Sequence, residues 1–378
     1  MTKGELTKKE IKRLRERLEY KARLVWDVIP PAEKKEVFAL GEVYKKFLDR
    51  AKTEREAVAH IRRTALENGF SENPAPGSCR PFFRAFHGKS IALVRPCKGQ
   101  TEQGVRLIVS HLDAPRLDLK QKPLYEEADL SFLKTHYYGG IKKFQWLARP
   151  LALHGRIIRG DGETIDLAVG EDPADPVFTI LDLLPHLARK TQYEKKLALA
   201  IPGEKLNLLA GSLPLGEADD NCRFKLAVLE YLSRTYGLVE EDLISAELEV
   251  VPAEKARDVG WDRALVGAYG QDDRICAFAS LKAVLDTTRN DTAAVVLFVD
   301  KEEIGSDGAT SAKSRFIESV IGDLLQCMGQ EPDSRAVFRM LSSSRALSGD
   351  VTGALDPDYP EVHEKRNAAR LGYGLCLT

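Results

Sequence analysis

Four short clusters of histidine and acidic residues contain the side chains best suited to chemistry. The clusters are His111-Leu112-Asp113, Gln271-Asp272-Asp273-Arg274, Asp300-Lys301-Glu302-Glu303-Ile304-Gly305-Ser306 and Ser348-Gly349-Asp350. Each has an ordinary explanation when taken alone, because structural histidines, helix-capping aspartates and turn aspartates are common. Taken together, one imidazole and several carboxylates without a thiolate suit zinc, cobalt or manganese. The clusters therefore favour a metallohydrolase centre.

The first cluster follows the predicted strand Val105–Ser110. Because side chains alternate along a strand, His111 and Asp113 are expected on the same side. A carboxylate in that position can fix the imidazole tautomer while the other ring nitrogen binds a metal ion.

The third cluster follows a strongly apolar strand predicted over Thr292–Val299. Its charged side chains crowd the carboxyl end of that strand, which is costly unless another charge balances them. A divalent cation is the simplest balance.

The clusters are distributed over two α/β segments that flank a β-rich one. Residues 1–117 and 266–378 are predicted to form one domain with a central mixed β-sheet flanked by helices. Residues 118–265 are predicted to form a β-rich domain inserted into the first, with one clear helix over Phe224–Tyr236. An α/β fold with an inserted β-rich domain is therefore expected.

Other elements follow from apolar periodicity and capping signals. A charged helix is predicted over residues 5–29, and a third helix begins at the capping box of Thr53 and Glu56. The helix between them has an apolar face made of Val37, Leu40, Tyr44, Phe47 and Leu48. The apolar run Leu371–Thr378 is predicted as a strand.

Composition and charge exclude several classes of protein. The 378 residues include 56 basic and 57 acidic side chains, a net charge of −1, so no field of one sign attracts nucleic acid or an anionic membrane. No apolar window approaches the roughly eighteen residues of a transmembrane helix, and the charged N-terminus is not a secretory signal. Six scattered cysteines without a CxxC pair favour reduced thiols. We expect a cytoplasmic protein.

The motifs resemble those of the M18 aminopeptidases. The matching stretches are Gly104–Lys120 for the first metal motif, Asp300–Ser306 for the glutamate pair, Ser348–Asp350 for the late aspartate and Leu183–Ala188 for a histidine segment of the inserted domain. The resemblance covers essentially the whole chain with the motifs in the same order. It implies an aminopeptidase with two zinc ions that hydrolyses peptide substrates.

The resemblance also implies a metal ligand set. His111 and Asp350 would bind the first zinc, Glu303 would bind the second, and Asp272 would bridge the two. Asp113 would support His111 from behind.

Two further roles follow from the same resemblance. Glu302 would be the general base that takes a proton from the attacking water. His186 would steady the tetrahedral intermediate, in a neighbouring subunit, because the inserted domain builds dimers and larger assemblies in this family. A homo-oligomer is therefore expected.

The sequence departs from the family pattern in two places. Family members carry a further histidine near the C-terminus that ligates the second zinc, whereas the one histidine after Asp350 is His363, in a polar segment. The second zinc would keep two carboxylates, Asp272 and Glu303, so we expect a chain that ends before this ligand and is poorly active alone. Relatives that prefer aspartyl substrates also place a lysine where the nearest stretch here is Arg370–Tyr373, which puts an acidic preference in doubt.

Three alternative interpretations remain at this point. The chain could be a catalytically impaired homologue that acts only as an assembly or binding subunit. It could be another two-zinc peptidase, such as a deblocking aminopeptidase or a dinuclear carboxypeptidase, although the glutamate-pair string and Pro185-His186 count against both. A nucleotide-binding enzyme is disfavoured because no phosphate-binding glycine motif follows a predicted strand.

Overall fold

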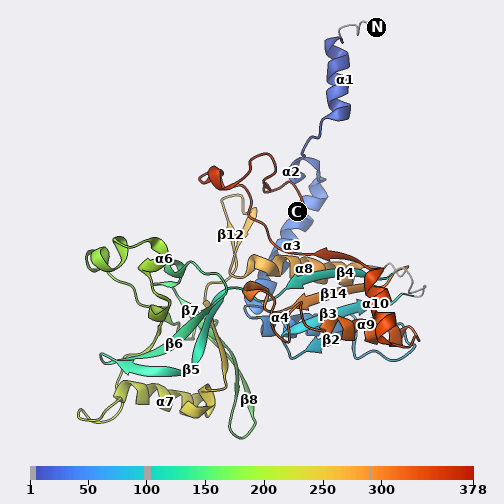
Figure 1. The fold of residues 1–378 in the computed structure, drawn as a ribbon. Coiled ribbons are helices and arrows are strands. Elements are labelled where there is room, and N and C mark those ends of the chain that lie inside the picture. The colour runs from blue at the N-terminus through green and yellow to red at the C-terminus, as the bar shows by residue number, and fades with distance from the viewer. Residues whose placement is uncertain (1–5, 98–103, 289–290) are drawn as a thin grey trace. The chain divides into compact units, whose positions relative to one another are not determined.

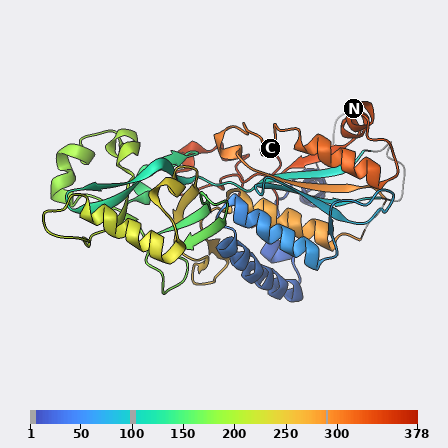
Figure 2. The same cartoon turned by 90° about the horizontal axis from the view of Figure 1, so that it is seen from below.

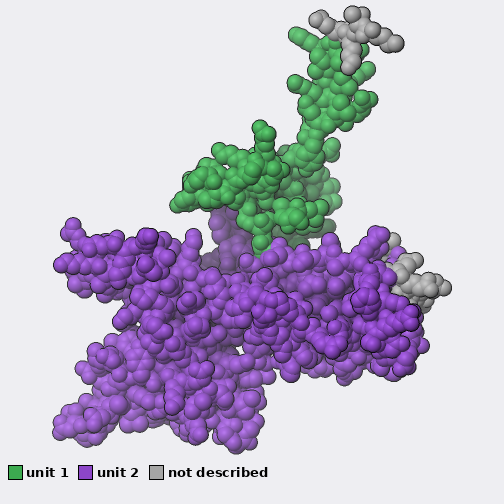
Figure 3. Space-filling view, viewed as in Figure 1, with its two compact units in different colours: residues 1–42, 351–378 green, residues 43–350 purple. Residues whose placement is uncertain are grey.

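The computed structural model describes residues 6–97, 104–288 and 291–378 (Figure 1). The chain divides into two compact units (Figure 3). One unit contains residues 43–350, with all four chemical clusters, and the other contains residues 1–42 together with 351–378.

The helices alternate with strands along much of the chain. The α-helices are α1 (Lys8–Leu18), α2 (Val25–Val28), α3 (Pro31–Arg50), α4 (Glu54–Glu67), α5 (Pro185–Ala188), α6 (Leu197–Ala200), α7 (Arg223–Tyr236), α8 (Gln271–Asp286), α9 (Phe316–Cys327) and α10 (Ser334–Ser342). Short helical turns are η2 (Lys143–Trp146), η3 (Arg189–Tyr193), η4 (Gly203–Lys205), η5 (Glu240–Leu243), η6 (Glu302–Ile304) and η7 (Pro360–Val362). The predicted capping box of Thr53 and Glu56 begins α4.

The first sheet is mixed and has the strand order β1-β2-β3-β14-β4-β15. Its strands are β1 (Ser71–Glu72), β2 (Phe82–Phe86), β3 (Ser90–Arg95), β4 (Arg106–His111), β14 (Ala294–Val299) and β15 (Arg345–Ser348). Both β14 and β15 pair with β4 in parallel. The carboxyl ends of these three strands therefore meet at one edge of the sheet.

Helices cover both faces of this sheet (Figure 2). On one face, Ile91 and Phe298 pack with residues of α3, α4 and α8. On the other face, Val94 and Leu297 pack with residues of α9 and α10. Burial on both faces explains why β3 and β14 are continuous apolar runs in the sequence. The predicted central mixed sheet flanked by helices is confirmed.

The second sheet is antiparallel and has the strand order β8-β7-β11-β5-β6-β10-β9. Its strands are β5 (Arg116–Glu127), β6 (Leu130–Tyr138), β7 (Leu151–Ile158), β8 (Thr164–Val169), β9 (Thr179–Ile180), β10 (Leu208–Gly211) and β11 (Glu247–Pro252). The core beneath it joins Leu117 and Val250 to Leu229 and Leu232 of α7. A separate two-stranded ribbon pairs β12 (Arg257–Val259) with β13 (Leu265–Gly267).

The strands of the two sheets occupy different parts of the chain. Every strand of the first sheet lies outside residues 118–265, and those of the second run from Arg116 to Pro252. This arrangement agrees with an inserted β-rich segment, and the domain boundaries at 118 and 265 stay a prediction. The cytoplasmic location also stays a prediction. Within the described residues, no helix combines the length and apolar character needed to cross a bilayer.

Three local predictions differ from the structure. The helix expected over residues 5–29 is interrupted and becomes α1 and α2. On α3, the buried members of the predicted apolar face are Tyr44, Phe47 and Leu48, whereas Val37 and Leu40 are exposed. Residues 371–378 form no strand. A strand needs a partner for its backbone groups, and no strand pairing involves this run.

Candidate metal centre

The parallel strands β4 and β14 bring the first and third clusters together. Val299 at the end of β14 lies opposite His111 at the end of β4. After β14, Lys301 adopts a left-handed conformation (φ 68°) and reverses the chain into η6, which carries Glu302 and Glu303. The glutamate pair therefore returns to the edge at which His111 lies.

The fourth cluster reaches the same edge from β15. Gly349 continues the pairing with β4 by donating its backbone N–H to Val109 O at 2.7 Å. A Cβ at Gly349 would lie 3.1 Å from the Cβ of Cys276 on α8, so a larger residue would be crowded here. This close approach places Asp350 beside the N-terminus of α8.

The second cluster lies at that N-terminus, but Asp272 is not a helix cap. Asp272 (φ −82°, ψ 113°) and Asp273 interrupt the helical backbone at the start of α8, and among the described residues no backbone N–H of the helix donates to the Asp272 carboxylate. The side chain of Asp272 is 57% exposed. The capping explanation is therefore excluded for this residue.

His111 lies at the centre of these groups and is only 3% exposed. Its Nδ1 lies 3.0 Å from Asp113 O and 3.3 Å from Asp113 Oδ1. Its Nε2 points the other way, 3.2 Å from Asp272 Oδ1, 3.8 Å from Glu302 Oε2 and 3.9 Å from Asp350 Oδ1. The Nε2 atom is buried and, within the described part of the chain, has no hydrogen-bond partner of good geometry. A buried nitrogen that faces three carboxylates without a hydrogen bond fits a metal ligand.

The side chains form two overlapping groups of candidate ligands. One contains His111, Asp272 and Glu303, and the other contains Asp272, Asp273 and Asp350. Within each group the ligand atoms lie within 4.8 Å of one another. The structure thus brings together the four predicted ligands, with Asp272 common to both groups.

Burial, together with the crowding of like charges, perturbs the pKa values of the carboxylates of the centre. Burial raises the pKa of Glu303 to about 7, and the nearby carboxylate of Asp272 adds to this effect. Burial also raises the pKa of Asp273 to about 6. Burial alone would lower the pKa of His111, but the carboxylates of Asp113 and Asp272 raise it to about 11. Burial is the main cause of the two raised carboxylate pKa values, and the contributions of neighbouring carboxylates to all three shifts indicate negative charge that a cation would balance.

A thiolate ligand is absent from both groups of the described residues. Cys276 lies nearby on α8, but burial and a hydrogen bond with Asp273 raise the pKa of its thiol to about 12. The thiol therefore stays protonated at neutral pH. Nitrogen and carboxylate oxygen ligands suit zinc, and the residues present fit such an ion.

Asp113 fixes this arrangement through hydrogen bonds. Its buried carboxylate accepts hydrogen bonds from the backbone N–H groups of Glu302 (3.1 Å) and Glu303 (3.2 Å). It also accepts one from the hydroxyl of Tyr138 at 2.7 Å. Burial alone would raise the pKa of Asp113, but hydrogen bonds from His111 and Tyr138 hold it below its usual value. Asp113 is thus ionised and links the histidine to the glutamate pair.

Sequence reasoning missed Asp273 and Tyr138 as members of the site. Asp273 is fully buried, and its Oδ2 accepts the backbone N–H of His111 at 3.3 Å. Its position next to Asp272 was the one available signal. Tyr138 ends β6 in the second sheet, and nothing in the sequence connects it to Asp113.

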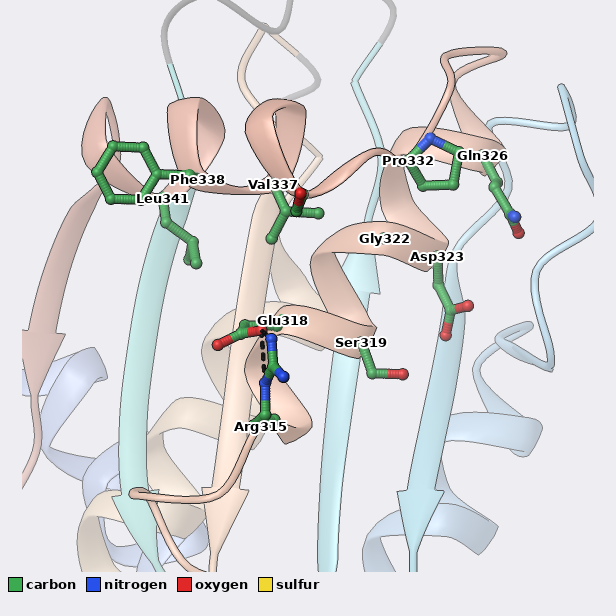
Figure 4. A pocket seen from close by; sticks show the side chains of 11 residues that line it. Arg315, Glu318, Ser319, Gly322, Asp323, Gln326, Pro332, Val337, Phe338 and Leu341 are labelled. Carbon is green, nitrogen blue, oxygen red and sulfur yellow. Dashed lines mark hydrogen bonds and ion pairs between the residues drawn. The ribbon is translucent and has the colours of Figure 1, made fainter.

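Two other features lie outside this centre. His186 is exposed on α5 and belongs to neither group of candidate ligands. A cavity of about 630 Å³ lies between α9 and α10 and is lined by residues such as Arg315, Asp323 and Phe338 (Figure 4). None of the metal-centre residues lines it, so cavity size alone does not locate the chemistry.

Comparison with known proteins decides the family. The family described as "Aminopeptidase I zinc metalloprotease (M18)" matches residues 47–378. The chain belongs to the M18 family of zinc aminopeptidases. This assignment makes it a hydrolase, and it replaces the deblocking-aminopeptidase, dinuclear-carboxypeptidase and nucleotide-binding alternatives.

Several M18 relatives resemble the chain over most of its length. A Clostridium acetobutylicum protein described as a probable M18 family aminopeptidase 1 is 44% identical over 359 residues, which cover 93% of this chain and 77% of that protein. The crystal structure of a Thermotoga maritima M18 aminopeptidase has a TM-score of 0.88 at 40% identity, covering 94% of this chain and 78% of that one. A yeast aminopeptidase solved as a dodecamer shares the M18 fold at 22% identity, with a TM-score of 0.69 and coverage of 88% and 76%.

Proposed function

We propose that this chain removes N-terminal residues from peptides with a cocatalytic pair of zinc ions. The observation that carries this proposal is the buried Nε2 of His111, which faces Asp272, Glu302 and Asp350 without a hydrogen-bond partner among the described residues. Because Asp272 belongs to both groups of candidate ligands, one carboxylate can serve two neighbouring ions.

The proposed ligand assignment is the one that the M18 motifs imply, and it differs from the two geometric groups, which join His111 with Glu303 and Asp350 with Asp273. His111, Asp272 and Asp350 would hold the first ion, and Asp272 with Glu303 would hold the second. Bound zinc ions supply Lewis-acid polarisation of the scissile carbonyl and lower the pKa of a coordinated water. Three protein ligands leave an open position for that water at the first ion.

Glu302 is the proposed general base. Its carboxylate lies at the same edge as His111 and is about half exposed, so water and substrate can reach it. Its backbone N–H is fixed by Asp113, which limits the directions its side chain can take. A carboxylate in this position can accept a proton from the attacking water and deliver it to the leaving amine.

The excess of carboxylates supports exopeptidase action. Asp272, Asp273, Glu302, Glu303 and Asp350 all lie around the imidazole or its two ligand groups. Two divalent ions neutralise part of this charge, and a free α-ammonium group of a peptide can neutralise more. A substrate with a blocked N-terminus lacks that charge.

We also propose a homo-oligomer in which His186 acts in the site of a neighbouring subunit. The segment around His186 exposes Leu183, Leu184 and Leu187. Exposed apolar side chains in one segment are typical of a protein interface. Residues 118–265 would then be the assembly and lid domain.

A second candidate function, an impaired homologue that serves as an assembly or binding subunit, is favoured by one observation. The second ion would have Asp272 and Glu303 as its protein ligands, and two carboxylates hold zinc weakly. With these two carboxylates alone, the second ion would be lost readily and turnover would depend on added zinc.

Hydrolysis of aminoacyl and N-acetylaminoacyl naphthylamides by the purified chain tests both candidates. We expect release of naphthylamine from the free-amine substrates, rising as zinc is added, and none from the acetylated ones. Hydrolysis of both substrate classes would contradict the aminopeptidase proposal. No hydrolysis at saturating zinc, with substrate still bound, would support the impaired homologue.

A further inference from the structure

Arg116 belongs to the Gly104–Lys120 motif but takes no part in the proposed chemistry. It is the first residue of β5, and its register partner across the antiparallel pairing is Tyr138, the last residue of β6. Directly opposed residues of two antiparallel strands place their side chains on the same face of the sheet. The guanidinium of Arg116 therefore reaches the ring of Tyr138, and its Cζ lies 4.1 Å from the ring centroid.

Three carboxyl groups hold this guanidinium in place. Its Nη1 lies 3.2 Å from Glu54 Oε2, while its Nε lies 2.8 Å from Asp118 Oδ1 and 3.3 Å from Glu249 Oε2. These groups come from α4, β5 and β11, so three elements fix the guanidinium, and Arg116 is only 4% exposed. A guanidinium can bind carboxylates with its edge while its flat face stacks on an aromatic ring.

The buried cluster keeps an ionised partner for Arg116. Burial alone would raise the pKa of Glu54, but Arg116 and Lys89, whose ammonium lies 2.9 Å from Glu54 Oε1, hold it below its usual value. Burial and the charge of Glu54 instead raise the pKa of Glu249 well above its usual value. An unpaired charge in this interior would be costly, so the guanidinium stays on Glu54.

The ring beneath the guanidinium carries the hydroxyl that donates to Asp113. Tyr138 Oη lies 2.7 Å from Asp113 Oδ2, and Nδ1 of His111 lies 3.3 Å from the other oxygen of that carboxylate. Burial raises the pKa of Tyr138, and the charge of Arg116 opposes this rise, which makes the hydroxyl a better donor. A chain of contacts therefore runs from the guanidinium through Tyr138 and Asp113 to the proposed zinc ligand His111.

We infer that Arg116 is a positioning residue of the proposed metal centre, which holds the ring of Tyr138 so that its hydroxyl stays on Asp113. The inference rests on the proposed zinc site. Without this support the ring can turn away, and the carboxylate loses a hydrogen bond that directs it. Because Asp113 also accepts the backbone N–H groups of Glu302 and Glu303, the effect reaches the loop of the glutamate pair as well.

Arg116→Lys tests this role in a double-mutant cycle with Tyr138→Phe. Lysine keeps the positive charge but lacks the flat face and the fork that contact the ring and the carboxylates. In the wild-type background we expect zinc affinity, measured by competition with a chelator, and kcat to fall about 5- to 10-fold, with KM within about 2-fold. In the Tyr138→Phe background, which lacks the hydroxyl, we expect Arg116→Lys to change zinc affinity by less than about 2-fold.

Two further variants complete the design. Arg156→Lys is the matched control, because Arg156 lies on β7 of the same sheet and pairs with Asp166 through Nε at 2.6 Å and Nη2 at 2.8 Å. It is expected to leave zinc affinity within about 2-fold. Asp118→Asn is a milder change, since the Asp118 side chain is 35% exposed and binds only Nε of the guanidinium. We expect about 3-fold weaker zinc binding, again only where the Tyr138 hydroxyl is present.

The outcomes separate this role from a purely structural one and from the proposed function. Equal weakening of zinc binding by Arg116→Lys in both backgrounds, no weakening, or an equal effect of Arg156→Lys overturns the positioning role, while hydrolysis by the zinc-loaded wild-type chain keeps the aminopeptidase intact. If Arg116→Lys does not fold, the same cycle with Asp118→Asn decides. A wild-type chain that binds no zinc overturns the proposed metal centre and this role with it.

Discussion

The hydroxyl of Tyr138 donates a 2.7 Å hydrogen bond to Oδ2 of Asp113, and both side chains are buried. Tyr138 belongs to the second sheet, whereas Asp113 follows strand β4 of the first sheet. The same carboxylate accepts the backbone N–H groups of Glu302 and Glu303. A residue of the second sheet therefore helps to fix the loop that carries the proposed base.

Tyr138→Phe is expected to weaken the metal centre while preserving the fold. Loss of a buried hydrogen bond to a charged group costs about 1.5–3 kcal/mol of stability. Because Asp113 orients His111, we expect about a tenfold loss in zinc affinity or kcat. Zinc competition with a chelator and steady-state kinetics measure both. Tyr125→Phe, also in the second sheet, is the control, and equal effects of the two substitutions would contradict the positioning role.

Glu302→Gln tests the general base. The amide keeps the shape of the side chain but cannot take up a proton, so kcat is expected to fall by about 10²–10⁴-fold. KM and zinc content should change little, because Glu302 belongs to neither group of candidate ligands. Zinc analysis and single-turnover kinetics check this. A variant that retains more than a tenth of wild-type kcat would exclude this role.

Zinc binding is expected to release protons in a pH-dependent way. In the metal-free protein, burial and Asp272 raise the pKa of Glu303 to about 7, so its carboxyl is protonated below that pH. Zinc must displace this proton, and the apparent affinity should fall as the pH falls below 7. Calorimetry in buffers of different ionisation enthalpy measures the release. Proton release that stays constant between about pH 6 and 9 would contradict the raised pKa.

His154 provides a pH-dependent contribution to stability. Its Nδ1 lies 2.7 Å from Glu56 Oε1 of α4 and its Nε2 lies 3.1 Å from Glu171 Oε1, which also pairs with Lys52 and Lys255. Burial alone would lower the pKa of His154, but Glu171 and Glu56 raise it above its usual value.

The sign of the effect follows from that shift. Because the folded-state pKa is raised, the stabilisation is complete below about pH 6.5 and disappears as the pH rises through the folded pKa. His154→Gln should therefore cost more stability at pH 6 than at pH 9, with a cost at pH 6 of about 3 kcal/mol. Urea unfolding at the two pH values measures this. His136→Gln, an exposed histidine of the same sheet, should show no such difference.

The sequence predicted the features that depend on local pattern. Strand β14, Ala294–Val299, lies within the predicted strand Thr292–Val299, because a strand buried on both faces is an uninterrupted apolar run. The convergence of His111 with Glu303 and Asp350 was predictable because motifs at the carboxyl ends of parallel strands meet at one edge of a sheet, whereas Asp272 reaches them from the start of α8.

Features that depend on contacts between distant elements were not predictable. Strands β5 and β6 were not predicted, since β5 contains the polar run Lys120–Lys122, and Tyr138 reaches Asp113 only because β6 ends beside the first sheet. Val37 and Leu40 on α3 are exposed, so an apolar face in the sequence does not specify how much of that face packs against other elements. Asp273 was missed because the spacing of residues in the sequence does not show which of two adjacent aspartates, Asp272 or Asp273, belongs to the site.

Anomalous scattering at the zinc absorption edge, from crystals grown with zinc, tests the central proposal most directly. We expect one strong peak bonded to His111 Nε2 and the carboxylates of Asp272 and Asp350. A weaker second peak should lie between Asp272 and Glu303. Zinc bound elsewhere, with His111 Nε2 hydrogen-bonded to protein or water instead, would contradict the proposed metal centre.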